Sequence, residues 1–297
     1  MLQWQIGDTK ITQLLEITDS SGELQVIPNA TPENLDGISW LKPNFVTPEG
    51  NLILNIQMLI IETPTRKMVV DTCIGNDKNL NMEGWANLQL PFLDDLQKLG
   101  HDPDSVDTVI CTHLHVDHVG WNTKKVSDKW VPTFPNARYL FSRAELDHLR
   151  HELSALDPDD TFGAVNAKTY EDSVSPILQQ ADLITENQAL AQTGIELLLT
   201  PGHTPGSMTL RLTSETHPIY FTGDVCHHPI QMLYPEMNSA YCQIPKAAVA
   251  TRRELLARCD REDALLLPAH FGPPHGCKVR AQESAFAPLW VPITDAG

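Results

Sequence analysis

The stretch Thr-His-Leu-His-Val-Asp-His at residues 112–118 contains four potential metal ligands, His113, His115, Asp117 and His118. It follows the β-rich apolar run 107–112, which predicts a strand that ends at the ligands. Residues two apart in an extended segment point to the same side, so His113 and His115 can converge on one ion. Asp117 and His118 lie after the strand end, where the chain turns, and can address a second ion. Imidazole and carboxylate together suit zinc, manganese or iron.

Three further strand-like runs in the second half of the chain also lead to a ligand type. Residues 195–199 precede the turn Pro-Gly-His-Thr-Pro-Gly that contains His203, residues 219–222 lead to Gly-Asp224, and residues 264–269 lead to His270. A single His or Asp at a strand end is usually a turn residue or a satisfied polar group. The repetition at four strand ends in one chain therefore indicates a shared metal site.

These motifs resemble those of the metallo-β-lactamase-fold hydrolase superfamily. Residues 68–75, Met-Val-Val-Asp-Thr-Cys-Ile-Gly, add a match to the Asp-Thr-Gly turn of that fold, with Cys73 where glycine is usual. The layout looks most like the quorum-quenching lactonases and the methyl-parathion-hydrolase type of esterase. The resemblance implies an α+β fold, a four-layer αβ/βα sandwich.

The same resemblance implies how the ligands divide. His113, His115 and His203 are expected to hold one metal, and Asp117, His118 and His270 the other, with Asp224 bridging the two. We expect two divalent ions, zinc first, with manganese or iron as alternatives. A metal-bound hydroxide would then attack a lactone or carboxyl ester, an acyl-homoserine lactone among them.

Some side chains around the ligands bear on catalysis and substrate. Asp117 is a candidate proton carrier as well as a ligand, and Asp71 is expected to orient the ligand loop. Lactonases of this type often place a tyrosine three residues after the bridging aspartate, whereas this chain has His227. His227 or His228 could donate in its place, or both could be polar loop residues. Trp121 could wall the substrate pocket or belong to the core.

Two other activities stay open at this point. One is hydrolysis of an organophosphate triester, which relative turnover on such substrates would separate from esterase activity. The other comes from a different class of enzyme, the mononuclear-iron sulfur dioxygenase that shares the fold. It predicts one iron per chain and oxygen consumption, so metal counting discriminates between it and a dinuclear hydrolase.

The composition limits partners and location. The net charge of −17 argues against a nucleic acid partner, because phosphate binding requires a basic face. No apolar segment approaches the length needed to span a bilayer, and the first residues carry no export signal, so we expect a cytoplasmic protein. The six dispersed cysteines are expected to be reduced thiols, with Cys226 a less favoured ligand. A homodimer is an expectation of the resemblance alone.

The chain shows no linker, so we expect a single domain over 1–297, with 1–50 partly an N-terminal elaboration. Apolar spacing and capping patterns predict four helical segments: 90–100, 142–156, 165–190 with a break near Pro176, and 246–260.

Overall fold

The computed structural model describes residues 2–157, 159–214 and 216–291. The chain groups into two compact units, one formed mainly by residues 8–16 and 57–185 and the other mainly by residues 17–56 and 186–291. Each unit carries the greater part of one mixed seven-stranded sheet. The predicted single domain stays a prediction. Within the described residues, no helix combines the length and apolar character required to cross a membrane.

The sheet of the first unit has the order β1-β2-β3-β4-β5-β8-β9. Its strands are β1 (Leu2–Ile6), β2 (Thr9–Asp19), β3 (Leu54–Glu62), β4 (Lys67–Val70), β5 (Thr108–Ile110), β8 (Arg138–Ser142) and β9 (Ala181–Ile184). β3 and β4 pair antiparallel, whereas β4, β5, β8 and β9 run parallel. Parallel strands need cover on both faces, which explains why all three residues of β5 are buried. The ligand stretch begins where β5 ends.

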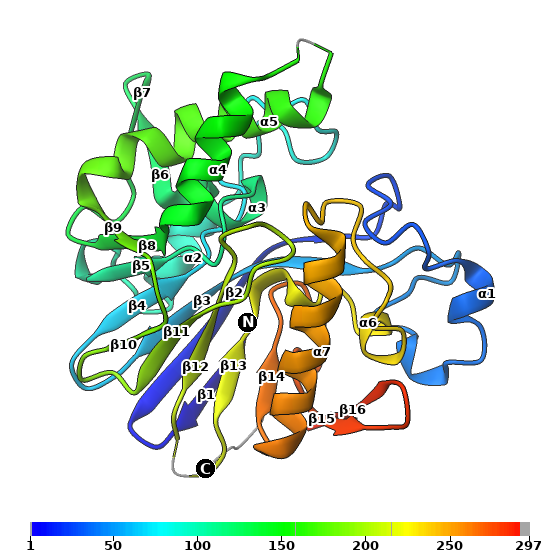
Figure 1. Ribbon diagram of the computed structural model, residues 1–297. Helices are drawn as coiled ribbons and strands as arrows, with labels where there is room; N and C mark the ends of the chain where they lie inside the picture. The colour runs from blue at the N-terminus through cyan, green and yellow to red at the C-terminus, as the bar shows by residue number, and fades with distance from the viewer. Residues whose placement is uncertain (1, 158, 215, 292–297) are drawn as a thin grey trace. The chain divides into compact units, whose positions relative to one another are not determined.

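Helices and a small hairpin complete the first unit (Figure 1). The helices are α2 (Phe92–Lys98), α3 (Val116–Val119), α4 (Arg143–Ser154) and α5 (Thr161–Thr169), and the hairpin is β6 (Thr123–Val126) with β7 (Lys129–Pro132). The Ser142 side chain caps α4 by accepting a hydrogen bond from the Glu145 backbone, as the capping pattern predicted. The predicted helices at 90–100 and 142–156 are confirmed.

The predicted helix over 165–190 is right only in its first part. α5 continues as a π-helix (Tyr170–Val174) and a 3-10 helix (Ser175–Gln180), which includes the expected break near Pro176. The chain then turns into β9 and later β10 (Gln188–Leu190). β9 finds a parallel partner in β8, and this non-local pairing overrides the local helical pattern.

The sheet of the second unit has the order β10-β11-β12-β13-β14-β15-β16. Its remaining strands are β11 (Ile195–Leu199), β12 (Met208–Leu212), β13 (Ile219–Phe221), β14 (Leu265–Leu267), β15 (Cys277–Ala281) and β16 (Phe286–Trp290). Only β13 and β14 pair in parallel among these neighbours. α7 (Pro245–Arg261), predicted at 246–260, packs along this sheet against β15 (Figure 1). Three of the predicted ligands follow strands of this sheet.

The segment before β3 belongs to the core of the second unit. It carries α1 (Pro32–Leu35) and a 3-10 turn (Ser39–Leu41). Phe45 is buried and stacks on Trp290 of β16, with ring centroids 5.0 Å apart. The core around it includes side chains of α6 (Ile230–Leu233) and α7. Aromatic packing therefore holds this part of the N-terminal segment in place.

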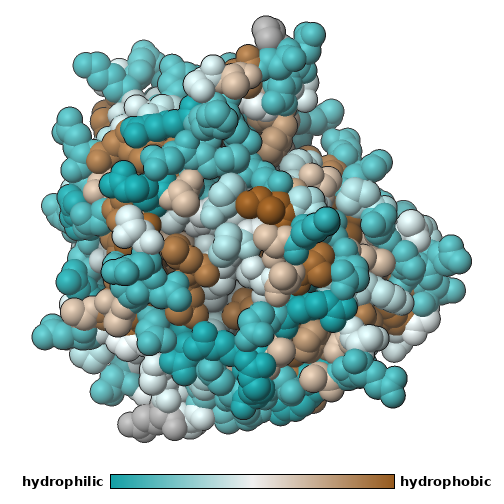
Figure 2. All heavy atoms as spheres, in the orientation of Figure 1, coloured by the Kyte–Doolittle hydropathy of each residue, from teal (hydrophilic) through white to brown (hydrophobic). Residues whose placement is uncertain are grey.

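The face in Figure 2 shows hydrophobic residues in small groups among hydrophilic ones. The large apolar side chains that are clearly exposed come from separate parts of the chain: Leu15, Val126, Leu156, Tyr234, Ile244 and Leu289. All six cysteines are buried and free, in agreement with the predicted reduced thiols. Two mixed sheets with helices confirm the predicted α+β class.

Candidate metal centre

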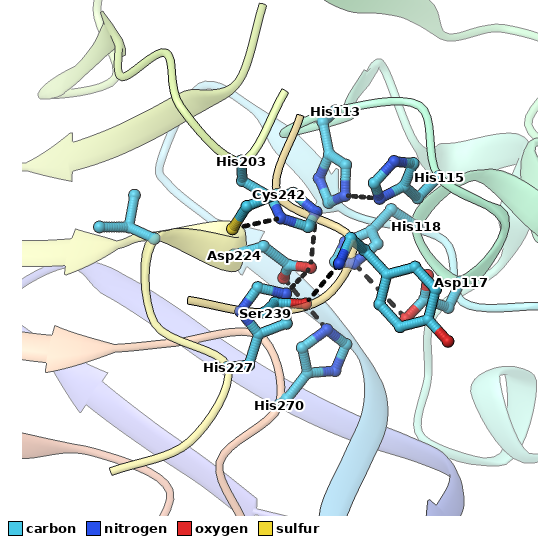
Figure 3. A network of polar contacts seen from close by, with 12 residues as sticks. His113, His115, Asp117, His118, His203, Asp224, His227, Ser239, Cys242 and His270 are labelled. Carbon is cyan, nitrogen blue, oxygen red and sulfur yellow. Dashed lines mark hydrogen bonds and ion pairs between the residues drawn. The ribbon is translucent and has the colours of Figure 1, made fainter. Parts of the chain in front are cut away.

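The first unit carries four of the predicted ligands on the segment after β5. His113 and His115 lie in the loop, and Asp117 and His118 lie in the single turn of α3, after the strand end as predicted. His113 Nε2 lies 3.1 Å from His115 Nδ1, and His118 Nε2 lies 3.6 Å from Asp117 Oδ2 (Figure 3). The three histidines are buried, and the Asp117 side chain is 13% exposed.

Asp71 orients this segment, as the sequence predicted. Its carboxylate accepts hydrogen bonds from the Thr112 backbone (2.7 Å), the Thr112 hydroxyl (2.8 Å) and His118 Nδ1 (2.8 Å). Because a carboxylate only accepts, His118 Nδ1 must carry the proton. The Nε2 lone pair of His118 therefore points away from Asp71, on the side of Asp117.

The Asp71 loop and the ligand segment interlock through their backbones. Three hydrogen bonds of 2.7 Å join them: Thr72 N to His118 O, Gly120 N to Cys73 O and Trp121 N to Thr72 O. A Cβ atom on Gly120 would lie 1.7 Å from the Ile74 carbonyl oxygen, so only glycine fits. Cys73 has a φ of +53°, which is the left-handed conformation that favours glycine. This explains why the resembling family usually has glycine at that position.

Glu16 supports the same loop and is a functional residue that no sequence motif indicated. Its carboxylate accepts from the backbones of Ile74 (2.7 Å) and Gly75 (3.0 Å) and from Trp121 Nε1 (2.7 Å). Burial raises the pKa of Glu16 to about 7, although these three donors act in the opposite direction. No motif surrounds Glu16 in the sequence, because its donors are distant along the chain.

Trp121 is a core residue in this unit. It is 4% exposed, and its indole stacks on Phe92 with ring centroids 5.6 Å apart. The one polar atom of its side chain, Nε1, donates to Glu16. These contacts favour the core alternative over a wall of the substrate pocket.

The second unit carries the remaining predicted ligands around one carboxylate. Asp224 Oδ2 lies 3.3 Å from His203 Nε2, and Asp224 Oδ1 lies 3.1 Å from His270 Nε2 (Figure 3). His270 Nδ1 donates to the Asn55 carbonyl oxygen (2.9 Å), so its Nε2 lone pair faces Asp224. His203 Nδ1 lies 3.7 Å from Cys242 Sγ. Each oxygen of Asp224 is thus faced by a different predicted ligand.

His227 and His228 have different surroundings. His227 Nε2 lies 3.1 Å from Asp224 Oδ2, and burial lowers the pKa of His227. His228 donates from Nε2 to the Phe45 carbonyl (2.8 Å) and accepts at Nδ1 from the Ile230 backbone (3.2 Å). Burial lowers the pKa of His228 to about 4. His228 is therefore a structural residue, whereas His227 belongs to the Asp224 cluster.

Arg252 on α7 fixes the loop that follows Asp224. Its guanidinium is fully buried. It donates to four neutral oxygens, namely Val225 O (2.8 Å), Pro235 O (2.5 Å), Met237 O (3.2 Å) and Asn238 Oδ1 (3.1 Å). No sequence pattern marks Arg252, because it lies among other charged residues of a helix, and such residues ordinarily face solvent.

The geometry within each unit fits a divalent cation. Two ligands about 2.0–2.1 Å from a tetrahedral zinc ion lie about 3.3 Å apart. The separations between neighbouring predicted ligand atoms range from 3.1 Å to 3.6 Å. Nε2 of His118 and Nε2 of His270 each face a carboxylate oxygen, an arrangement that is favourable only with a proton or a metal cation between the two atoms. Among the described residues, no cysteine joins a group of potential ligands.

Residues 54–270 match the family profile described as Metallo-beta-lactamase superfamily. The chain belongs to this superfamily. It is a metallo-β-lactamase-fold hydrolase, related at low identity to lactonases, with buried His and Asp groups that could hold metal ions. The predicted family and fold are confirmed.

Several relatives are N-acyl homoserine lactonases. The chain is 26% identical over 196 residues to one from Bacillus sp, a match that covers 61% of this chain and 68% of the relative. It is 26% identical over 183 residues to one from Bacillus thuringiensis, covering 57% and 63%. The chain thus spans about two thirds of the length of these relatives.

Two solved structures share the fold over nearly the whole chain. The hydrolase AbOPH of the beta lactamase superfamily superposes with a TM-score of 0.78 at 23% identity, covering 97% of this chain and 96% of its own. AidC, a dizinc quorum-quenching lactonase in complex with the product N-hexnoyl-L-homoserine, gives a TM-score of 0.79 at 19% identity, covering 98% and 96%. At these identities the likeness establishes the fold alone.

Proposed function

We propose that this protein is a dinuclear metal hydrolase that opens a lactone or a carboxyl ester. His113, His115 and His203 would hold one cation, and Asp117, His118 and His270 the other. Asp224 would bridge the two ions. The observation that carries the proposal is the environment of Asp224, whose two oxygens are faced by two different histidines at 3.3 Å and 3.1 Å.

Two divalent cations in this position would lower the pKa of a water molecule towards neutrality and polarise the substrate carbonyl. The protein's own groups would fix the ligands: Asp71 sets the orientation of His118, and the Asn55 carbonyl sets that of His270. Asp117 is the candidate to pass a proton to the leaving alkoxide, since its side chain is the least buried of the predicted ligands in its unit.

The substrate class follows from charge and from the relatives. The net charge of −17 disfavours an anionic substrate and favours release of the carboxylate that ester hydrolysis produces. Several relatives are named N-acyl homoserine lactonases, and AidC was solved with an acyl-homoserine product. A neutral acyl-homoserine lactone is therefore the first substrate to test.

The test uses purified protein with added zinc or manganese and follows ring opening of acyl-homoserine lactones, simple lactones and aryl esters. We expect turnover that is lost on chelation and abolished by Asp224→Ala. Asp263→Ala, which removes an exposed carboxylate of the same unit, serves as the matched control and should leave turnover unchanged. Failure on every lactone and ester with metals bound would reject the proposal.

The same preparation separates the alternatives. Preferential turnover of phosphotriesters would favour an organophosphate hydrolase. One iron per chain with oxygen consumption on a persulfide would favour the dioxygenase.

A further inference from the structure

A third imidazole reaches Asp224 in the second unit. His227 Nε2 lies 3.1 Å from Asp224 Oδ2, the same oxygen that faces His203 Nε2 at 3.3 Å. The rings of His203 and His227 have centroids 4.7 Å apart, and both are buried. His203, Asp224 and His227 each offer a ligand atom, and these three atoms lie within 4.8 Å of one another. One unit alone thus contains two imidazoles and a carboxylate that converge.

The two ring nitrogens of His227 have different surroundings. Among the described residues, no hydrogen-bond partner faces its Nδ1, which is buried. His228 next to it has both ring nitrogens satisfied. The nitrogen of His227 that faces another polar group is therefore Nε2, which points at Asp224.

The spacing also suits a cation. Separations of 3.1 Å and 3.3 Å from one carboxylate oxygen to two imidazole nitrogens match those between ligands of a single ion. Two histidines and one carboxylate form a set of ligand types that binds iron, zinc or related divalent ions.

We propose that His227 is a metal ligand, and that His203, Asp224 and His227 form a three-residue site that holds one divalent cation without help from the first unit. This inference deepens the proposed dinuclear centre and depends on Asp224 being one of its ligands. It assigns to His227 a place in the metal site itself, whereas the sequence left open a donor to substrate or a polar loop residue. The second unit then loads its cation independently of His113, His115 and His118.

The first experiment removes the ligands of the first unit in the full chain. A triple variant, His113→Ala with His115→Ala and His118→Ala, is loaded with cobalt or zinc, dialysed and analysed for bound metal. We expect one ion per chain. Adding His227→Phe should weaken its binding at least tenfold in a chelator competition, whereas the matched control His217→Phe, on an exposed histidine of the same unit, should not. Circular dichroism and thermal unfolding verify that each variant is folded.

The second experiment tests whether a cysteine at position 227 produces a new absorption band when cobalt binds. In the otherwise unchanged chain, His227→Cys places a thiol at the position of the imidazole. Cobalt loading should then produce thiolate-to-cobalt charge-transfer absorption that the wild-type protein lacks. The absorption spectrum does not depend on turnover, so a negative result would reject metal ligation at position 227 without testing the proposed hydrolase activity.

Three results would overturn the inference: a triple variant that binds no metal, unchanged affinity after His227→Phe, or a cobalt spectrum of His227→Cys identical to that of the wild type. Unchanged metal binding together with a raised KM for lactone in His227→Phe would assign His227 to substrate instead.

Discussion

Asp71→Asn is the sharpest test of how the first unit prepares its ligands. The carboxylate accepts three hydrogen bonds, and the one from His118 Nδ1 fixes which nitrogen of that ring is the ligand. An amide retains a carbonyl oxygen for the Thr112 backbone but places an NH2 group where His118 donates. Donor then faces donor, so the His118 ring must turn or lose its partner.

The magnitude follows from the bond that is lost. A hydrogen bond to a charged group contributes about 1.5–3 kcal/mol. If that energy serves to hold His118 in its binding orientation, metal affinity should fall about 10- to 100-fold, the range usual for partners of ligating histidines. The free energy of unfolding of the metal-free protein should fall by about 2 kcal/mol, since the Asp71 site is buried.

Chelator competition with zinc measures the affinity, and urea unfolding measures the stability. Asp107→Asn is the matched control, because the Asp107 carboxylate also accepts from a backbone N–H, that of Lys67 (2.7 Å), yet it bonds to no predicted ligand. This control should lose stability without losing metal affinity. Wild-type zinc affinity in Asp71→Asn would refute the role assigned to Asp71.

Three further perturbations test other parts of the account. Gly120→Ala should lower the free energy of unfolding by about 3 kcal/mol or more, because the added Cβ meets the backbone of Ile74. The control Gly84→Ala, which has open space around the Cβ but a positive φ, should lower it by only about 1 kcal/mol. Equal losses for the two variants in urea unfolding would contradict the clash at Gly120. The raised pKa of Glu16 means that the folded, metal-free protein binds a proton more tightly than the unfolded chain between the ordinary value of 4.5 and about 7. Its contribution is therefore fully present below pH 4.5 and lost as the pH rises through 7, so Glu16→Gln should flatten the stability-pH curve in that window; parallel curves would argue against the shift. Arg252→Lys keeps the buried charge but loses the several N–H donors of the guanidinium, so we expect a lower thermal midpoint of unfolding and weaker metal binding. Unchanged values would show that the loop after Asp224 keeps its conformation without the Arg252 hydrogen bonds.

The ligand types and the strand ends that present them could be predicted because both are local properties. The run 195–199 is β11, and α3 begins where the chain was expected to turn. Asp71 was also predictable, because it lies in a recognisable motif. Each of these follows from residue type and spacing within a few positions.

Other features depend on contacts between distant segments and left no local pattern. Glu16 acts through donors at Ile74, Gly75 and Trp121, and Arg252 acts through carbonyls of a separate loop. β9 forms only because β8 offers a parallel edge. The distinction between His227 and His228 likewise depended on Phe45, far away along the chain.

The need for two metal ions can be measured by titrating zinc into metal-stripped protein while lactone opening is followed at each step. We expect no turnover at first and a plateau at two zinc ions per chain. A plateau at one ion, or full turnover before any zinc is added, would contradict it.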